Sequence, residues 1–454
     1  MRIICHSISV LLFAGFFGCD VSKPSQPMEL ITVEEEKDYE TVPVSFDHPC
    51  AYVNAEDIER VRAHVAAADP SDPVYAAWLD FCSSEWAQET VKPGALSTIV
   101  RGDPTGTGVD KENYIVCDRQ AAAAFQLALR WRISGEVKYA EASRAILDEW
   151  ASVAKRITAN DNNQYLLAGF QGYTFANAAE LLRDYEGWTS SGQNKFKEWL
   201  KELWYAKNHW FIENHGGSNV CDLHYWSNWE LCNLASILAI GAYLEDADMV
   251  NYVNRQFLYG KGSGAVKNLV PFAPVADPDG KSGAIAQCME SGRDQGHATL
   301  CVSVTAELCR MAQNLGLDFW GAEQGRVLAF FEYVAKYNVK ENGVFITTSM
   351  PFSEYRYCVD CACTNHSHGA VHQSVSADGR GKERPGWDLI YAHYVKEMKG
   401  AAGSCYYSKL FAEQLRYRDG LLTGDGGAGD PRYGSSSGAY DQLGWGTLLF
   451  YQGD

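Results

Sequence analysis

The chain has 454 residues, a length that can form one large domain or two ordinary ones. Because 46% of the residues are hydrophobic, the chain can bury a core and is not expected to be disordered. Its 39 Lys and Arg against 57 Asp and Glu give a net charge of −18, which argues against nucleic acid or an anionic membrane surface as the main partner. A local basic cleft could still bind carboxylates, and its candidate residues are Arg119, Arg293, Lys382 and Arg384.

Residues 1–19 have the pattern of an export signal that ends in a lipidated cysteine. Arg2 precedes an apolar run over residues 8–17, which is too short to span a bilayer as a mature helix, and Cys19 ends a segment similar to a bacterial lipobox. Residues 20–44 are polar and indicate a flexible tether. We therefore expect an exported bacterial lipoprotein of the periplasm or the outer membrane, attached to the membrane only through an N-terminal lipid anchor.

The pattern from residue 45 to the C-terminus is helical, with apolar residues at intervals of three and four positions and turn signals between the runs. The predicted helices cover residues 55–68, 73–89, 118–134, 137–155, 165–185, 190–207, 222–244, 293–315, 386–399 and 405–415. Because they come in pairs joined by short turns, we predict an all-α fold, an α/α toroid or incomplete α/α barrel, in one domain over residues 45–454. Residues 342–380 lack this period and predict a small irregular insertion with one or two β-hairpins.

The chain contains 14 cysteines, and an oxidising compartment would permit disulfides among them. One cluster with histidines close behind it has the composition of a structural zinc site; its members are Cys358, Cys361, Cys363 and His366. A lone cluster of this kind is a weak metal signal. We therefore favour disulfides or buried thiols over a metal and expect no cofactor.

The stretch from Asp222 to Trp229 crowds polar and aromatic side chains. If Asp222 caps a helix, His224 and Asn228 share one face, and Tyr225 and Trp229 form the adjacent stripe. The alternative is a set of core aromatics with a satisfied buried histidine. The glycine-containing loop directly before the stretch favours a ligand site.

A second stretch, 290–297, places Glu290, Arg293, Asp294 and His297 at i, i+3, i+4 and i+7. A solvated stripe of salt bridges explains the first two residues well. It does not explain the histidine or the neighbouring glycines, which suggest close approach of a substrate or another backbone. Both stretches therefore predict side chains that line one wet cleft.

From residue 46 onward the chain resembles the alginate lyase superfamily of polysaccharide lyases, α/α-toroid enzymes that cleave uronic-acid polymers. The motifs that carry the resemblance are His48-Pro49, residues 57–62, residues 134–150, Asn228-Trp229 and residues 293–297. The best-known members have Asn-Asn-His where this chain has Asp222-Leu223-His224, so Asn228 must supply the missing amide.

The resemblance implies cleavage by β-elimination. Arg293 and Asn228 would quench the charge of the uronate carboxylate, which makes the C5 proton removable. His224 or His297 would be the base, and Tyr225 would protonate the leaving oxygen, with Tyr173, Tyr355 and Tyr433 as alternative acids. With these groups at hand we expect no metal in the reaction. The expected substrate is an anionic polysaccharide, either alginate (polymannuronate) or glucuronan, and its further contacts would be Gln171, Tyr173, Glu290, Trp229, Arg119 and Tyr433.

Two other functions compete with this one. A glycoside hydrolase on the same toroid would need a pair of carboxyl groups, for which the chain offers Asp118, Asp222, Glu230, Glu290 and Asp294. A non-catalytic glycan-binding lipoprotein would need only the tether and aromatic surface, and it leaves the ionisable stripe at 290–297 without a purpose.

Overall fold

The computed structural model describes residues 39–102, 111–215, 222–347, 350–356, 371–400 and 402–453. Its helices are α1 (Ala55–Ala67), α2 (Pro73–Ser83), α3 (Tyr114–Ser134), α4 (Val137–Val153), α5 (Asn163–Leu182), α6 (Ser190–Trp199), α7 (Ala206–Asn214), α8 (Ser227–Leu244), α9 (Ala247–Tyr259), α10 (Val266–Leu269), α11 (Gln295–Asn314), α12 (Ala322–Asn338), α13 (Trp387–Tyr391), α14 (Tyr406–Leu415) and α15 (Gly446–Phe450).

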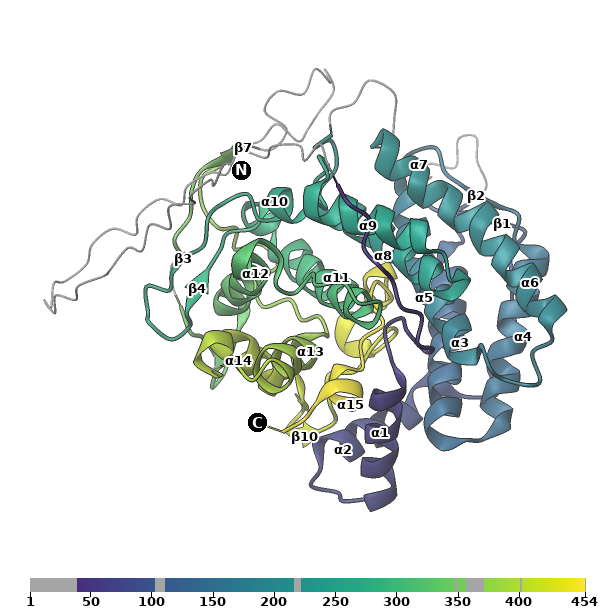
Figure 1. Cartoon of the computed structure of the whole chain (residues 1–454). Coiled ribbons are helices and arrows are strands. Elements are labelled where there is room, and N and C mark those ends of the chain that lie inside the picture. The colour runs from purple at the N-terminus through teal and green to yellow at the C-terminus, as the bar shows by residue number, and fades with distance from the viewer. Residues whose placement is uncertain are drawn as a thin grey trace, which may run out of the picture.

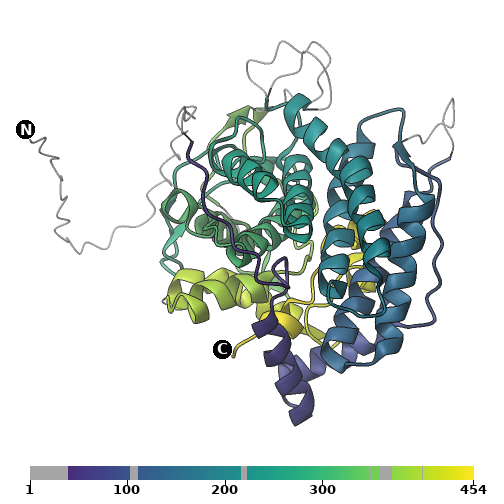
Figure 2. The same ribbon diagram turned by 45° about the vertical axis from the view of Figure 1, so that its right-hand side comes forward.

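These helices pack as inner and outer partners around an incomplete ring (Figure 1). The inner helix α3 pairs with α4, α5 with α7, α8 with α9, α11 with α12, and α13 with α14, while α6 packs on α4. Figure 2 shows the helices of the first half of the chain standing beside those of the middle. The predicted α/α toroid is therefore confirmed.

The inner helices are buried on nearly all sides, which explains their composition. In α5 and α8 almost every residue is buried, and small side chains let the two helices approach closely. The outer helix α9 instead has one apolar face. It buries Met249, Val250, Val253 and Phe257, and Asp246 caps it by accepting from the backbone N–H of Met249 at 3.1 Å. The core therefore lies between the two layers.

Several helix boundaries differ from the predicted ones. Asp222 does not cap a helix, because α8 begins only at Ser227 after an extended Trp226. The range 190–207 continues through a π-helical turn (Leu200–Tyr205) into α7, and two outer helices, α9 and α12, lie outside the predicted ranges. Periodicity finds an amphipathic helix more reliably than it finds the helix ends.

Strands are short and pair only in twos. They are β1 (Thr98–Val100), β2 (Arg156–Thr158), β3 (Val275–Ala276), β4 (Ala284–Ile285), β5 (Lys340–Glu341), β6 (Val344–Phe345), β7 (Tyr355–Arg356), β8 (Val371–His372), β9 (Tyr417–Arg418) and β10 (Leu421–Leu422). The pair β1–β2 is parallel, with Ile99 opposite Ile157. The antiparallel pairs β5–β6 and β7–β8 lie in or next to the predicted insertion, so the expected hairpin character is observed there.

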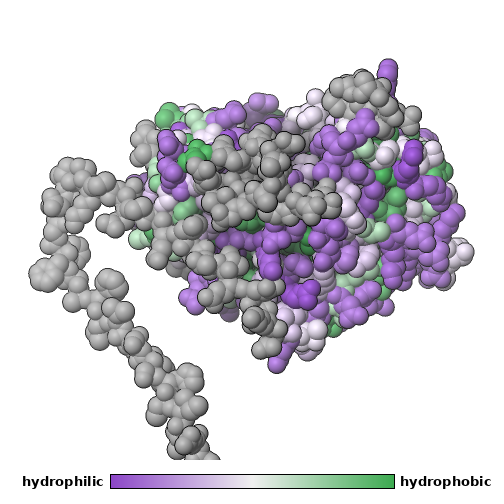
Figure 3. Space-filling view, turned by 90° about the horizontal axis from the view of Figure 1, so that it is seen from above, coloured by the Kyte–Doolittle hydropathy of each residue, from purple (hydrophilic) through white to green (hydrophobic). Residues whose placement is uncertain are grey.

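The predicted signal and most of the tether lie outside the described residues. The last tether residues do not hang free: the backbone N–H of Val42 donates to Asn251 Oδ1 at 2.8 Å, and Asn254 of α9 donates to the hydroxyl of Tyr39 at 2.7 Å. No helix in the described ranges is long and apolar enough to cross a membrane. Seen from above, the visible described surface is mainly hydrophilic, with apolar residues in small groups (Figure 3).

The cysteines of the described ranges are free thiols rather than disulfides. They are Cys50, Cys82, Cys117, Cys232, Cys288, Cys301, Cys309 and Cys405, and all but Cys82 are buried. Burial raises the pKa of Cys288 to about 12, so this thiol is protonated and inert. The zinc candidates Cys358, Cys361, Cys363 and His366 fall outside the described residues.

We predict that Gly169→Ala destabilises the fold. A Cβ on Gly169 would lie 2.3 Å from Sγ and 3.0 Å from the backbone carbonyl carbon of Cys232, where α5 and α8 cross. Overpacking of this kind costs about 1–3 kcal/mol, which urea unfolding would measure. Gly94→Ala is the matched control, because no heavy atom lies within 4 Å of its Cβ position. Equal unfolding free energies for the two variants would contradict the close approach.

Candidate active site

A cavity of about 330 Å³ lies where the N-terminal parts of three inner helices meet. It is lined by Arg101, Asn163, Leu166, Phe170, Asn228, Trp229, Arg293, His297, Leu300, Arg384, Ser437, Gly438 and Asp441. The first turns of α5, α8 and α11 border it, and helix N-termini favour bound anions. Three arginines and one carboxylate, Asp441, are among the described lining residues, so the cavity has the charge expected for an anionic ligand.

One wall of the cavity is organised by Glu290, which is fully buried. Its Oε1 accepts from the amide Nδ2 of Asn228 at 2.8 Å, and its Oε2 pairs with Nη1 of Arg293 at 3.2 Å. The guanidinium of Arg293 also stacks over the ring of Trp226, 4.7 Å from its centroid. The amide and the guanidinium are therefore fixed side by side at the cavity wall, and each keeps donors for a ligand.

The second functional group of this wall is an Asp–His pair. Asp294 caps α11 by accepting from the backbone N–H of His297 at 2.8 Å, and its other oxygen is 2.6 Å from Nδ1 of the same histidine. Burial alone would raise the pKa of Asp294, but the hydrogen bonds from His297 and the charge of Arg293 lower it overall. The ionised carboxylate favours the proton on Nδ1, which leaves Nε2 of the 38% exposed imidazole for proton exchange.

The opposite set of lining residues comes from distant loops. Arg101 follows β1, and its Nη2 donates to Oγ of Ser437 at 3.3 Å. Arg384 donates from Nη1 to the carbonyl of Gly438 and, at 3.5 Å, to Oδ2 of Asp441. Burial raises the pKa of Asp441, and the two arginines offset part of that rise.

A buried carboxyl group lies beside this wall. Asp118 of α3 is fully buried, and neither of its oxygens has a hydrogen-bond partner. Burial raises the pKa of Asp118 to about 8, and the nearby charge of Arg101 offsets only part of the effect. Near neutral pH this side chain is therefore mainly protonated and does not cancel the charge of Arg101.

The structure brings together most of the residues predicted to carry the chemistry. Asn228, Trp229, Arg293 and His297 line the cavity, and Glu290 lies directly behind it. The helical stripe expected at 290–297 is instead a 3₁₀ turn (Met289–Gly292) followed by the cap of α11. Glu290 is thus a buried partner of Arg293 and Asn228 and does not face a substrate.

His224 and Tyr225 do not line the cavity. His224 precedes α8, is only 8% exposed and meets the ring of Tyr225 edge-on at 4.6 Å, so the predicted shared helix face with Asn228 is wrong. Tyr225 packs on Trp229 with centroids 4.6 Å apart, and its hydroxyl accepts from the amide of Asn162. Burial raises the pKa of this phenol.

Four predicted substrate contacts occupy other positions. Tyr173 and Tyr433 are core residues whose hydroxyls donate to the backbone carbonyls of Asp441 and Asp425. Gln171 is 1% exposed. Arg119 is exposed, stacks over the ring of Trp86 and is not among the residues that line the cavity. The aromatic and polar period on an inner helix does not reveal which side faces the cavity, because both sides are covered.

Sequence reasoning missed Arg101, Asn163, Ser437 and Asp441 as cavity residues. Arg101 follows a short strand and Asn163 begins α5, while Ser437 and Asp441 belong to a glycine-rich segment near the C-terminus. No local spacing links these positions. Arg384 was expected in a basic cleft, and it does line the cavity.

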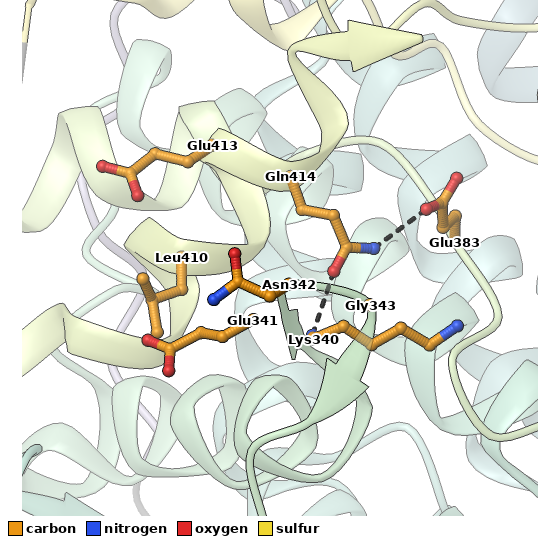
Figure 4. A pocket seen from close by; sticks show the side chains of 8 residues that line it. All are labelled: Lys340, Glu341, Asn342, Gly343, Glu383, Leu410, Glu413 and Gln414. Carbon is orange, nitrogen blue, oxygen red and sulfur yellow. Dashed lines mark hydrogen bonds between the residues drawn. The ribbon is translucent and has the colours of Figure 1, made fainter. Parts of the chain in front are cut away.

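A larger hollow of about 790 Å³ lies elsewhere, between the β5–β6 hairpin and α14 (Figure 4). Glu341, Glu383 and Glu413 line it with Lys340. Gln414 accepts from the backbone N–H of Lys340 at 3.0 Å and donates to Glu383 at 2.9 Å. Three carboxylates against one ammonium would repel an anionic sugar, so this hollow is not the candidate active site.

Comparison with known proteins finds one matching family model and several solved structures of similar fold. The family model described as alginate lyase matches residues 65–345. The crystal structure of alginate lyase A1-III from Sphingomonas species A1 is similar with a TM-score of 0.52 and 16% identity, covering 90% of this chain and 98% of that one. A tyrosine-to-phenylalanine variant of alginate lyase A1-III complexed with tetrasaccharide aligns at 17% identity, with a TM-score of 0.45, over 64% of this chain and 77% of that one. Curated proteins give no significant match.

We predict that Asp118→Asn weakens the dependence of stability on pH. The native state keeps the proton of Asp118 up to about pH 8, whereas the unfolded chain releases it near pH 4, so the free energy of unfolding falls between these values as pH rises. The slope for one such group is about 1.4 kcal/mol per pH unit. Urea unfolding at about pH 5 and about pH 8 should show a smaller decline for the variant. Parallel declines would show that Asp118 is ionised in the folded protein.

Proposed function

Because the chain belongs to the alginate lyase family, we propose that it is a polysaccharide lyase that cleaves a uronic-acid-containing polymer by β-elimination. The observation that carries the proposal is the joint position of Arg293, Asn228 and His297 on one cavity. Elimination at a uronate needs a group that quenches the carboxylate and a base beside C5. This wall offers both.

The reaction steps follow from the chemistry of these groups. Arg293 and Asn228 donate hydrogen bonds to the substrate carboxylate, which stabilises the charge that develops when C5 loses its proton. Nε2 of His297 accepts that proton, the C5–H electron pair forms the C4–C5 double bond, and the C4–O bond breaks. The imidazolium of His297 then gives this proton to the leaving oxygen, which becomes the hydroxyl of the released chain end, and the imidazole returns to its neutral form. Asp294 stabilises the imidazolium that forms in between.

The cavity also narrows the choice of substrate. No tyrosine is among the described lining residues, and His297 is the one imidazole there. A single imidazole serves best as base and then acid when the C5 hydrogen and O4 lie on the same face of the sugar. This arrangement occurs in mannuronate and glucuronate, whereas the two groups lie on opposite faces in guluronate. We therefore favour polymannuronate or glucuronan as the polymer.

A glycoside hydrolase fits the cavity less well. Such an enzyme needs two carboxyl groups across the scissile bond, and Asp441 is the one carboxylate among the described lining residues. Glu290 and Asp294 are engaged by Arg293, Asn228 and His297. Three acids considered for a pair remain. Asp118 is fully buried beside Arg101 and does not line the cavity, Glu230 is buried against His215, and Asp222 lies next to the same histidine.

The expected location belongs to the same proposal. Export through the N-terminal signal and a lipid on Cys19 would place the lyase in the bacterial periplasm or on the outer membrane, where polysaccharide fragments arrive. The amide and guanidinium groups make a metal unnecessary for the elimination.

The proposed function is tested with a panel of polymers. Alginate, polymannuronate, polyguluronate and glucuronan are incubated with the purified protein, and ultraviolet absorbance follows the C4–C5 double bond. We expect unsaturated products from polymannuronate or glucuronan. Reducing ends that appear without ultraviolet absorbance would mean hydrolysis, and no cleavage of any polymer would refute the lyase assignment.

We predict that Arg293→Ala lowers kcat/KM by about 10² or more, because a charge-assisted contact to the substrate carboxylate is lost. Arg293→Lys should recover only part of the activity, since an ammonium reproduces neither the planar pair of donors nor the stacking on Trp226. Arg62→Gln on α1 is the control, because that side chain is exposed and bonds to the carbonyl of Arg132. Turnover close to wild type in a folded Arg293→Ala protein would remove Arg293 from the mechanism.

We predict that His297→Ala abolishes most of the turnover and leaves thermal unfolding within a few degrees of wild type, because its ring contributes little to packing. Asp294→Asn should lower kcat less than His297→Ala does. The N–H at Nδ1 of His297 loses its charged acceptor, but the imidazole that acts as the base remains. His209→Ala, which alters a 41% exposed ring on α7, should retain full activity. An active His297→Ala enzyme would assign proton abstraction to another group.

A further inference from the structure

We propose that Arg101 and Arg384 form a second carboxylate-binding subsite, so that the cavity binds two uronates of the same chain. The inference rests on the proposed function and specifies its substrate: the uronate that loses its C5 proton must be next to another uronate. Arg293 and Asn228 bind the carboxylate of the reacting sugar, and the arginine pair binds that of its neighbour.

The first support is unused hydrogen-bonding capacity. Arg101 is 9% exposed and Arg384 is 7% exposed, and both line the cavity. Nη1 of Arg101 and Nε of Arg384 are buried without a hydrogen-bond acceptor. A buried guanidinium donor without an acceptor is costly, so its presence at a cavity wall indicates a ligand that supplies oxygens.

The second support is an excess of positive charge. Of the two nearby carboxyl groups, Asp118 is mainly protonated near neutral pH, because burial raises its pKa to about 8. Asp441 alone is left to balance two guanidinium groups, and only Nη1 of Arg384 reaches it, at 3.5 Å. By contrast, Arg293 is already paired with Glu290 at 3.2 Å. The Arg101–Arg384 side therefore lacks an anion that the Arg293 side has.

The third support is rigidity. Backbone N–H of Arg101 donates to the carbonyl of Thr158 at 3.2 Å, and its guanidinium stacks 4.9 Å from the ring centroid of Tyr114. Arg384 is held by the carbonyl of Gly438 and by Oε1 of Gln442 at 2.9 Å. Arginines fixed in this way lose little entropy when a planar carboxylate binds, which suits them to specificity.

The size of the cavity agrees with two neighbouring sugars. Its volume of about 330 Å³ is at the small end of ligand sites and leaves room for a short oligosaccharide segment that continues into solvent. Leu166, Phe170 and Leu300 form the apolar part of the lining between the polar groups. An apolar surface of this kind suits the less polar face of a sugar ring.

The test uses the polymer that the wild-type enzyme cuts, together with the same polymer after about half of its carboxyl groups are reduced to alcohols. Mass spectrometry of the products reports whether uronate is enriched at either of the two positions that flank the new unsaturated ring. We expect strong enrichment at one of them for the wild type. Arg384→Gln and Arg101→Gln should lose this enrichment and raise KM on the intact polymer about 10- to 100-fold, with a much smaller change in kcat.

Two outcomes would overturn the subsite. The first is enrichment that persists in both variants, and the second is an equal loss of kcat on the intact and the reduced polymer. If Arg384→Gln does not fold, Arg101→Gln gives the same readout, because its side chain has the single hydrogen bond to Ser437. Arg62→Gln is the control and should match the wild type throughout.

Failure of the proposed function gives a different pattern. If no unsaturated product forms from any polymer, calorimetric titration with saturated tetramers of mannuronate and of glucuronate tests the subsite alone. Weaker binding by Arg384→Gln and Arg101→Gln than by Arg62→Gln would retain the anion subsite and reject the lyase. If all three variants bind the tetramers with the affinity of the wild type, the anion subsite is overturned.

Discussion

The arrangement of the candidate active site depends on one buried carboxylate, Glu290. It accepts from Asn228 at the start of α8 and from Arg293 just before α11, and so it joins two inner helices at the cavity wall. Removing it would leave an amide and a guanidinium without their buried partner, which costs several kcal/mol in comparable cases. The same carboxylate engages Arg293 through Nη1, and Nε lies 3.6 Å from Oδ2 of Asp294, so Nη2 remains for the substrate. Glu290 therefore fixes the position of Asn228 and Arg293 and also determines which of their donors can bind a ligand.

The local charge of the cavity differs from that of the whole molecule. A protein of net charge −18 repels polyanions at long range, and three arginines at one cavity must reverse that field locally. Helix geometry contributes to the reversal, because the N-terminal parts of α5, α8 and α11 border the cavity and present the positive ends of their dipoles. Burial of Asp118 contributes as well, since a protonated carboxyl group beside Arg101 leaves that charge uncompensated.

The sequence predicts a feature of the fold or the site well when the residues that form it lie close together in the chain. The cap Asp294 lies with Arg293 and His297 in one short stretch, so sequence alone located these three residues. Most helical segments were also located from sequence, but the outer helices α9 and α12 were not. His224 was misplaced because the helix start at Ser227 depends on packing of the aromatic residues before it. Tyr173 was taken for a substrate contact because an aromatic residue on a fully covered helix resembles one on a binding face, and Tyr433 because its glycine-rich segment could return across the cleft. Arg101, Ser437 and Asp441 come from separate loops, and only tertiary structure brings them together.

The C-terminal segment holds in place the residues that contact Arg101 and Arg384 at the cavity. Glu307 of α11 accepts from the backbone N–H groups of Leu443 and Gly444 at 2.9 and 3.0 Å, and the hydroxyl of Tyr173 donates to the carbonyl of Asp441. These buried bonds tie the glycine-rich segment to the inner helices and so hold Ser437 and Asp441 at the cavity. The family model ends at residue 345, before this segment and before Arg384. Arg293 and His297 therefore lie within the residues that the family model matches, whereas Arg384, Ser437 and Asp441 follow them in the sequence.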